Sequence, residues 1–275
     1  MRVDHVTLTT VLAATSEGGG FPAPSIEEFE WPCIGPSFGH VFGYDVCFNR
    51  VTLLMIIAAV IVLAMFYFAF REPKLVPRGF QNAMEVGVEF VRNNIVLEVI
   101  GPKGLPFMPY LLSLFFFIFI GNLMGVVPPF LFPVNSRIAV PLFLALCSWL
   151  LFNYAGIKEQ GLSGYLRSTL FPPGIPWWVY ILVTPIEFVS TFLVRPFTLA
   201  VRLLANMIAG HLVLAVFFLG AAYLFTRPLT AVFGVGSFLA GLIFVLFELL
   251  VAVLQAYIFT ILNAVYLAGA LEPEH

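Results

Sequence analysis

An arginine inside an apolar stretch is the residue of this sequence that most needs a chemical explanation. Arg202 lies in a run, from Pro196 to His211, that is otherwise apolar enough to lie in lipid. Arginine keeps its charge, and placing it near the centre of a bilayer costs from about 2.5 to more than 10 kcal/mol. In a helix, Asn206 shares the face of Arg202, whereas His211 points to roughly the opposite side, about 13 Å farther along the axis. A fixed positive charge and a titratable imidazole at different depths of a membrane suggest a path for protons.

The composition is that of a polytopic membrane protein. The chain has 275 residues, of which 61% are hydrophobic and 10% are charged, whereas soluble domains carry roughly 25% charged residues. A net charge of −2 gives no support for nucleic-acid binding. The cysteines are too few and too scattered for a metal cluster, and no Gly-x-x-x-x-Gly-Lys loop for nucleotide phosphates is present. We therefore expect no metal and no cofactor in this chain.

Residues 1–49 form a polar leader that is rich in glycine and proline and holds six of the fifteen acidic residues. A signal peptide is conceivable, but Asp4 stands where positive charge is expected, so we expect an irregular segment with at most a short helix. Cys33 and Cys47 form either a disulfide, if the leader is outside the cytoplasm, or two free thiols. Cys147 falls in an apolar span and is expected to be a small core residue.

The segments after the leader have the lengths and patterns of membrane helices. An uncharged run predicts a span at about 50–71, and the basic residues that follow it place that end in the cytoplasm and the leader outside. Polar side chains at spacings of three and four then predict an amphipathic helix at about 78–99, lying on the membrane or against a partner. Further spans are expected at about 106–128 and 137–157, followed by a loop over 158–175.

The remaining hydrophobic sequence predicts two long helices, at about 177–226 and 228–271, separated near Arg227-Pro228. Each segment is about twice as long as the roughly 20 residues of a vertical span and contains no charged loop. This favours two strongly tilted helices in an antiparallel hairpin. Small residues such as Ala205 and Gly210 would let the two helices approach closely.

The polar residues of the two long helices fit a single hairpin register. In an antiparallel pair, residues that face each other have numbers with a constant sum, and Arg202 with Gln255 gives nearly the same sum as His211 with Glu248. Glu248 and Gln255 are seven residues apart and share a face. The sequence thus predicts one polar layer holding Arg202 and Gln255, and a second layer, holding His211 and Glu248, nearer the turn.

Each of these residues also has a purely structural interpretation. Arg202 could pair with Glu187, which lies fifteen residues earlier, and His211 could be a core histidine with its hydrogen bonds satisfied. Glu248 is harder to explain in this way, because a buried carboxylate without a partner would be protonated or costly. Arg195 is expected to cap a helix or to extend towards an interface.

Four strings in the second half of the chain resemble the signature of subunit a of F-type ATP synthases. They are LAVRLLAN at 199–206, AGHL at 209–212, PIE at 185–187 and ELLVAVLQAYIF at 248–259. The resemblance covers about residues 50–270, including the order of the helices and the amphipathic second helix, and excludes the leader. It implies an all-α polytopic fold with one membrane domain over 50–275, containing two to three vertical spans, one interfacial helix and the tilted hairpin.

The resemblance also implies a role for each polar residue. Arg202 matches the essential coupling arginine beside a rotating ring of c subunits, where its charge would favour an ionised ring carboxylate and block proton transfer between two offset half-channels. The other residues match the family's proton path, with His211 and Glu248 in the outer half-channel, Glu187 in the inner one, and Asn206 and Gln255 near the arginine.

The implied partners are the c-subunit ring, the peripheral-stalk b subunits, the other ATP synthase subunits and the lipid bilayer, with no nucleic acid. Nucleotide chemistry would belong to other subunits, so the chain would not be an enzyme by itself. The expected location is the plasma membrane of a bacterium, with the N-terminus outside and the C-terminus in the cytoplasm.

Three other classes of membrane protein compete with this interpretation. A secondary transporter usually shows two similar halves with broken helices, and this sequence shows no repeat. A quinone-binding respiratory subunit would fit the composition but does not account for the Arg202 string. A structural scaffold would not need five ionisable residues in two helices.

Overall fold

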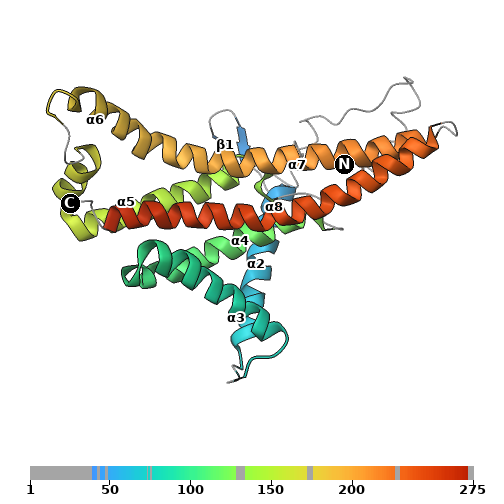
Figure 1. The fold of residues 1–275 in the computed structure, drawn as a ribbon, viewed down its shortest axis with the longest axis horizontal. Coiled ribbons are helices and arrows are strands. Elements are labelled where there is room, and N and C mark those ends of the chain that lie inside the picture. Colours follow the sequence, from blue (N-terminus) through green and yellow to red (C-terminus); the bar gives the residue numbers. More distant parts are fainter. Residues whose placement is uncertain are drawn as a thin grey trace. The chain divides into compact units, whose positions relative to one another are not determined.

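The structure is a computed structural model that describes residues 39–41, 44–46, 49–72, 74, 76–127, 134–171, 176–226 and 230–271. Figure 1 shows the order of the helices along the chain. The chain divides into two compact units, of which the smaller contains Ile208–Leu250 and the larger contains Cys33–Met207 and Val251–His275. Cys33 and Cys47, for which a disulfide or two free thiols are predicted, lie outside the described residues.

A short β-hairpin precedes helix α2 (Arg50–Phe70). Strand β1, Gly39–Val41, pairs antiparallel with strand β2, Tyr44–Val46, so that Val41 lies opposite Tyr44. Valine and tyrosine favour extended backbone. The predicted irregular conformation of the leader is therefore wrong for these two strands.

The first membrane-length helix, α2, spans Arg50–Phe70 and begins at a well-formed cap. The side-chain oxygen of Asn49 accepts hydrogen bonds from the Thr52 backbone amide at 3.0 Å and from the Thr52 hydroxyl at 3.1 Å. The first of these satisfies an amide that has no partner inside the helix. After this cap, residues 51–70 are all uncharged, as a helix in contact with lipid requires.

The amphipathic pattern at about 78–99 corresponds to two consecutive helical elements. Helix α3 spans Phe80–Val91, and the π-helical η2 continues over Arg92–Ile100. A sharp turn follows at Gly101, where φ of +79° is a conformation that favours glycine. The 3-10 helix η3, Pro102–Phe107, then leads into helix α4, Met108–Val126.

Helices α2, α3 and α4 pack against one another in the larger unit (Figure 1). Met84 and Val91 on the apolar side of α3 are buried. Gly87 lets α3 approach α4 closely, because a Cβ at this position would lie 2.9 Å from the Phe116 ring. The same ring meets Phe66 of α2 edge-on at 5.1 Å. The apolar side of α3 therefore packs against α2 and α4.

Two pairs of polar side chains between α4 and the elements that follow it are hydrogen-bonded. Asn135, in the 3-10 helix η4 (Val134–Ser136), donates to the Asn122 side-chain oxygen of α4 at 2.7 Å. The Tyr110 and Ser148 hydroxyls lie 2.7 Å apart. Such pairing removes most of the cost of placing polar groups in an apolar interior.

Helix α5 spans Ala139–Leu170 and bends sharply at Gly161, where φ is +73°. The residues after the bend turn back onto those before it, because the buried Tyr165 donates to the Asn153 side-chain oxygen at 3.0 Å. The loop predicted over 158–175 is therefore wrong as far as Leu170. Packing of Tyr165, which sequence periodicity does not report, extends the helix beyond the predicted span.

The second half of the chain forms two very long helical segments. Helix α6 (Tyr180–Val189), the π-helical η5 (Ser190–Val194) and helix α7 (Arg195–Phe225) follow one another without a break. The π-helical turns lie just before Pro196, whose ring would clash with a regular helix at the preceding turn. Helix α8 spans Ala231–Leu271.

Helices α7 and α8 are antiparallel neighbours within each unit. In the larger unit, the Arg195 guanidinium stacks on the Tyr266 ring at 5.1 Å. In the smaller unit, the Ser237 hydroxyl donates to the Phe217 carbonyl at 2.8 Å, and the Phe217 ring lies 5.8 Å from Phe244. Five of the described helical segments are long and apolar enough to cross a membrane. The predicted all-α polytopic class is therefore confirmed.

Replacement of Gly156 by alanine should destabilise the fold. A Cβ at Gly156 would lie 2.5 Å from the Tyr165 ring and 3.2 Å from the Ala270 Cβ. Overpacking of this kind costs about 1–3 kcal/mol, partly offset by about 1 kcal/mol of helix propensity. Thermal unfolding of the detergent-solubilised chain measures the difference.

Gly269→Ala is the matched control, because a Cβ there has no neighbour within 4 Å among the described residues. It should leave the unfolding temperature unchanged or raise it. Equal unfolding temperatures for the two variants would contradict the close packing at Gly156.

Candidate functional site

Arg202 lies on an exposed stripe of α7. Thr198, Arg202, Ala205 and Asn206 are all exposed and recur at helical spacing, so they share one face. The opposite face is buried and apolar, with Leu199, Ala200, Leu203 and Met207. Ala205 was predicted to let α7 approach α8, but its exposure shows that it faces away from the interior. A helix that presents one cation between small side chains can be approached closely by another helix.

The Arg202 guanidinium forms no hydrogen bond or ion pair with any residue that the structure describes. Glu187, on α6, is half-buried and is likewise not paired with Arg202. The structural alternative in which Glu187 neutralises Arg202 is therefore absent from this structure. In a helix of membrane-spanning length, a cation with no partner among the described residues of its own chain favours an anionic partner from another subunit.

An amide pair lies one turn along α7 from Arg202. The Asn206 side-chain nitrogen donates to the Gln255 side-chain oxygen at 3.1 Å, which joins α7 to α8. Gln255 is only 4% exposed, and its side-chain nitrogen has no partner among the described residues. The predicted layer of Arg202 and Gln255 is thus shifted, because Gln255 bonds to Asn206 instead.

Glu248 lies in the smaller unit, on the buried side of α8, and is 5% exposed. Its carboxylate lies directly over Gly210 of α7, where any Cβ would collide with the carboxylate oxygens. His211 is the next residue of α7 and is half-buried. Glu248 therefore occupies a space that exists because residue 210 has no side chain.

For Gly210 the sequence predicts only that its small size lets the two long helices approach closely. The sequence does contain one indication of a contact between Gly210 and Glu248. The sum of their residue numbers is nearly that of the pairs predicted to face each other in the hairpin. The contact itself depends on the rotation of each helix about its axis, which the sequence pattern does not determine.

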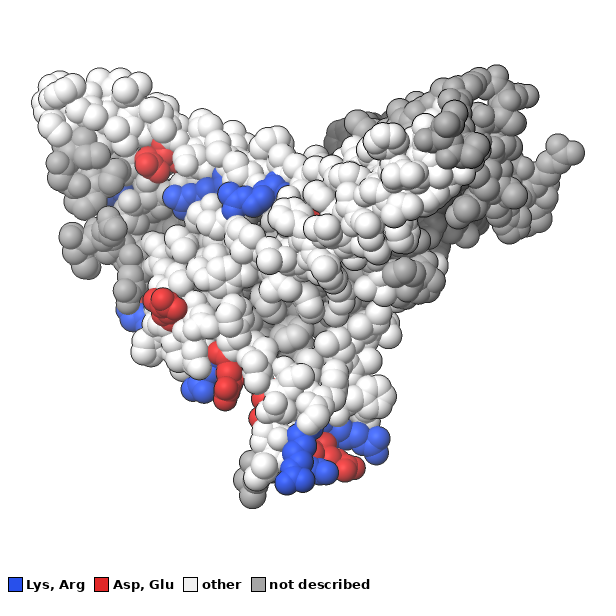
Figure 2. All heavy atoms as spheres, turned by 45° about the vertical axis from the view of Figure 1, so that its right-hand side comes forward, with Lys and Arg blue, Asp and Glu red and all other residues white. Residues whose placement is uncertain are grey.

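Charged side chains are few on the described surface. Figure 2 shows a face on which lysine, arginine, aspartate and glutamate occupy a few small groups and the rest of the described surface is neither basic nor acidic. Among the described residues, no group of three histidine, cysteine, aspartate or glutamate side chains could hold a metal ion. The chemistry available here is that of isolated ionisable groups and amides in an apolar setting.

Comparison with known proteins gives a consistent family. Residues 52–268 match the family described as ATP synthase A chain. ATP synthase subunit a of Rhodococcus erythropolis is 41% identical over 277 aligned residues, covering 100% of this chain and 99% of the relative. The subunits a of Frankia alni and Parafrankia sp. are 46% and 45% identical, covering 92% and 96% of this chain and 86% and 88% of the relatives. A match of this length and identity shows that the chain belongs to the ATP synthase subunit a family.

Proposed function

We propose that this chain is the stator that guides protons to and from a rotating ring of c subunits, with Arg202 as the coupling residue. The observation that carries this proposal is the exposure of Arg202 on α7, without a partner among the described residues of its own chain. A carboxylate presented by a ring subunit is the group that such a cation would accept. Exposed Thr198 and Ala205 leave room for a helix of the ring.

As a member of its family the chain is a non-catalytic, proton-translocating subunit of the membrane sector, and the catalytic sites lie in other subunits. Proton movement must therefore be converted into motion of a partner. Each charge that crosses gains about 2.3 kcal/mol per 100 mV of membrane potential. Rotation of a ring is a way to sum several such crossings for each nucleotide made.

Arg202 would act in two ways as a ring carboxylate passes. Its positive charge stabilises the ionised carboxylate, which therefore releases its proton on one side before it meets the arginine. The guanidinium does not give up a proton at physiological pH and so cannot pass protons onward. Both effects oblige a proton to travel with the ring rather than leak directly between two offset half-channels.

The remaining polar residues would form these half-channels. His211 and Glu248 are assigned to the outer one, and Glu187 to the inner one. The burial of Glu248 over Gly210 supports a carboxyl group that is held in place within the helix pair. The amide pair of Asn206 and Gln255 would line the region around the arginine, a role supported by its hydrogen bond between α7 and α8.

The proposed orientation rests on the charges at the end of α2. Arg71, Lys74 and Arg78 follow this helix and favour a cytoplasmic position for its C-terminal end. The N-terminus is then outside, and five membrane crossings bring the C-terminus into the cytoplasm. We assign the chain to a bacterial plasma membrane, with the c-ring and the peripheral-stalk b subunits as its neighbours. The amphipathic helix α3 is the proposed contact for a peripheral partner.

Arg202→Ala should abolish ATP-driven proton pumping and ATP synthesis while the complex still assembles. The reason is that nothing would then hold the ring carboxylate ionised or separate the half-channels, so a passive proton leak should appear. Pumping is measured by a pH-sensitive dye in inverted vesicles, and assembly by subunit content. Arg167→Ala, which removes an exposed arginine of α5, is the control and should pump normally. Normal pumping by the Arg202 variant would overturn the proposal.

Gly210→Ala should slow proton pumping by about tenfold, equivalent to about 1.4 kcal/mol, because the added Cβ displaces the Glu248 carboxylate. Gly236→Ala, where a Cβ meets nothing within 4 Å among the described residues, should have no effect. Aspartate is shorter than glutamate and leaves room for the added Cβ. Gly210→Ala should therefore slow pumping less in a Glu248→Asp background than in the natural sequence, as a double-mutant cycle measures. Strictly additive losses would show that the two positions do not interact.

A further inference from the structure

A hollow between α2 and α5 is lined by none of the described residues that are assigned to the proton path. It has a volume of about 340 Å³, near the lower end of the roughly 300–1,000 Å³ typical of ligand pockets. All of the described residues that line it belong to the larger unit. They are Asn49, Val51, Thr52, Met55, Arg137, Ala139, Val140 and Phe143.

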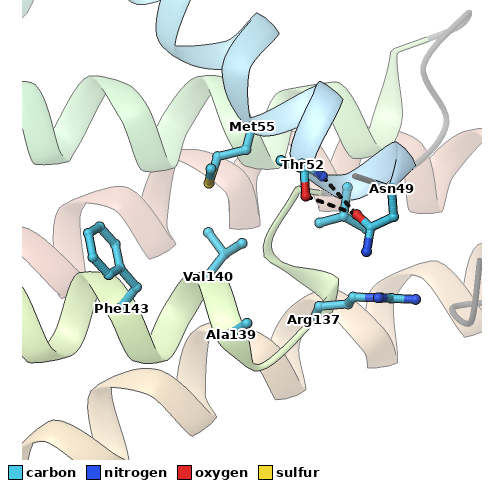
Figure 3. Close-up of a pocket in the computed structure, with 8 residues that line it drawn as sticks. Asn49, Thr52, Met55, Arg137, Ala139, Val140 and Phe143 are labelled. Carbon is cyan, nitrogen blue, oxygen red and sulfur yellow. Dashed lines mark hydrogen bonds between the residues drawn. The ribbon is translucent and has the colours of Figure 1, made fainter. Parts of the chain in front are cut away.

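The lining is divided into a polar end and an apolar wall. Figure 3 shows Asn49, Thr52 and Arg137 at one end of the hollow, while Met55 and Phe143 lie toward the other. An occupant that satisfies both ends is amphipathic, with a polar head and an apolar chain.

The polar end also coincides with the boundary of two membrane spans. The apolar run of α2 starts at Val51, two residues after Asn49, and α5 starts at Ala139, two residues after Arg137. The polar end of the hollow thus lies where a bilayer changes from headgroups to hydrocarbon, and the apolar wall lies at the depth of acyl chains.

The charge at the polar end favours an anion. Among the described residues that line the hollow, Arg137 is the one that carries a charge. Its guanidinium has five N–H donors, enough to serve a phosphate beside another partner. The Asn49 oxygen is used by the helix cap, and its amide nitrogen faces the same end (Figure 3). Basic pockets between membrane helices bind anionic lipid headgroups on the cytoplasmic side of membranes, and the same attraction between a guanidinium and a phosphate operates on either side.

We propose that this hollow binds an anionic phospholipid, with the phosphate at Arg137 and Asn49 and part of one acyl chain along Met55, Val140 and Phe143. The lipid would fill the space between α2 and α5 and hold the two helix ends together. The site does not depend on the proposed role of Arg202, nor on which side of the membrane it faces.

Photoactivatable lipids test this site in the assembled complex. The complex is reconstituted in phosphatidylcholine vesicles with a trace of either phosphatidylglycerol or phosphatidylcholine that carries a diazirine on its acyl chain, and cross-linked peptides are mapped by mass spectrometry. The anionic probe should label the α2 and α5 wall about fivefold more than the zwitterionic probe, the selectivity expected from one arginine. Equal labelling by the two probes, or no labelling at the wall, would overturn the proposal.

Two variants separate the headgroup from the acyl chain. Arg137→Gln should reduce labelling by phosphatidylglycerol to the level of phosphatidylcholine, while Arg167→Gln, an exposed arginine outside the hollow, should not. Ala139→Leu fills the hollow and should reduce labelling by both probes. Unchanged labelling in Arg137→Gln and Ala139→Leu would show that lipid contacts this surface without occupying the hollow. ATP-driven pumping by each preparation verifies that the complex is intact.

Discussion

The cost of a charge without water or a counter-ion is the constraint on which the rest of this structure depends. A bilayer offers an arginine neither, so each arginine inside a membrane helix must find its own compensation. Arg195 does so within the chain by stacking on Tyr266. Arg202, two turns later on α7, is exposed and has no such contact among the described residues. Arg195 is therefore a structural charge, whereas Arg202 is available to a partner.

The same constraint organises the uncharged polar groups. Asn135 bonds to Asn122 between η4 and α4, and Asn206 bonds to Gln255 between α7 and α8. These bonds join separate elements of the chain and satisfy polar atoms where water is scarce. Gly210 also accommodates a polar group between the helices, since the absence of a side chain leaves the space in which the Glu248 carboxyl group lies. Polar residues in this chain therefore define helix contacts as well as the proposed path for protons.

The class of fold could be predicted from the lengths of the hydrophobic segments alone. Apolar segments of 20 and of more than 40 residues are typical of helices that lie in a membrane. The helix through 158–170 could not be predicted in the same way, since it depends on Tyr165 packing back after the turn at Gly161. The partner of Gln255 could not be predicted from the sequence either. A shift of α7 by one turn along α8 places Asn206 instead of Arg202 opposite Gln255, and the hydrophobic pattern fits both arrangements. Hydrophobic periodicity thus gives the elements, whereas side-chain shape determines their register.

The environment of Arg202 in the assembled enzyme tests the central claim most directly. Electron cryomicroscopy of the complete complex, at a resolution that shows side chains, would locate its guanidinium relative to the ring. The account predicts that Arg202 faces the c-ring and lies within about 4 Å of a ring carboxylate, or one water molecule away, in at least one rotational state. An Arg202 side chain that faces lipid in every state, or that is paired with an acidic residue of its own chain, would contradict it.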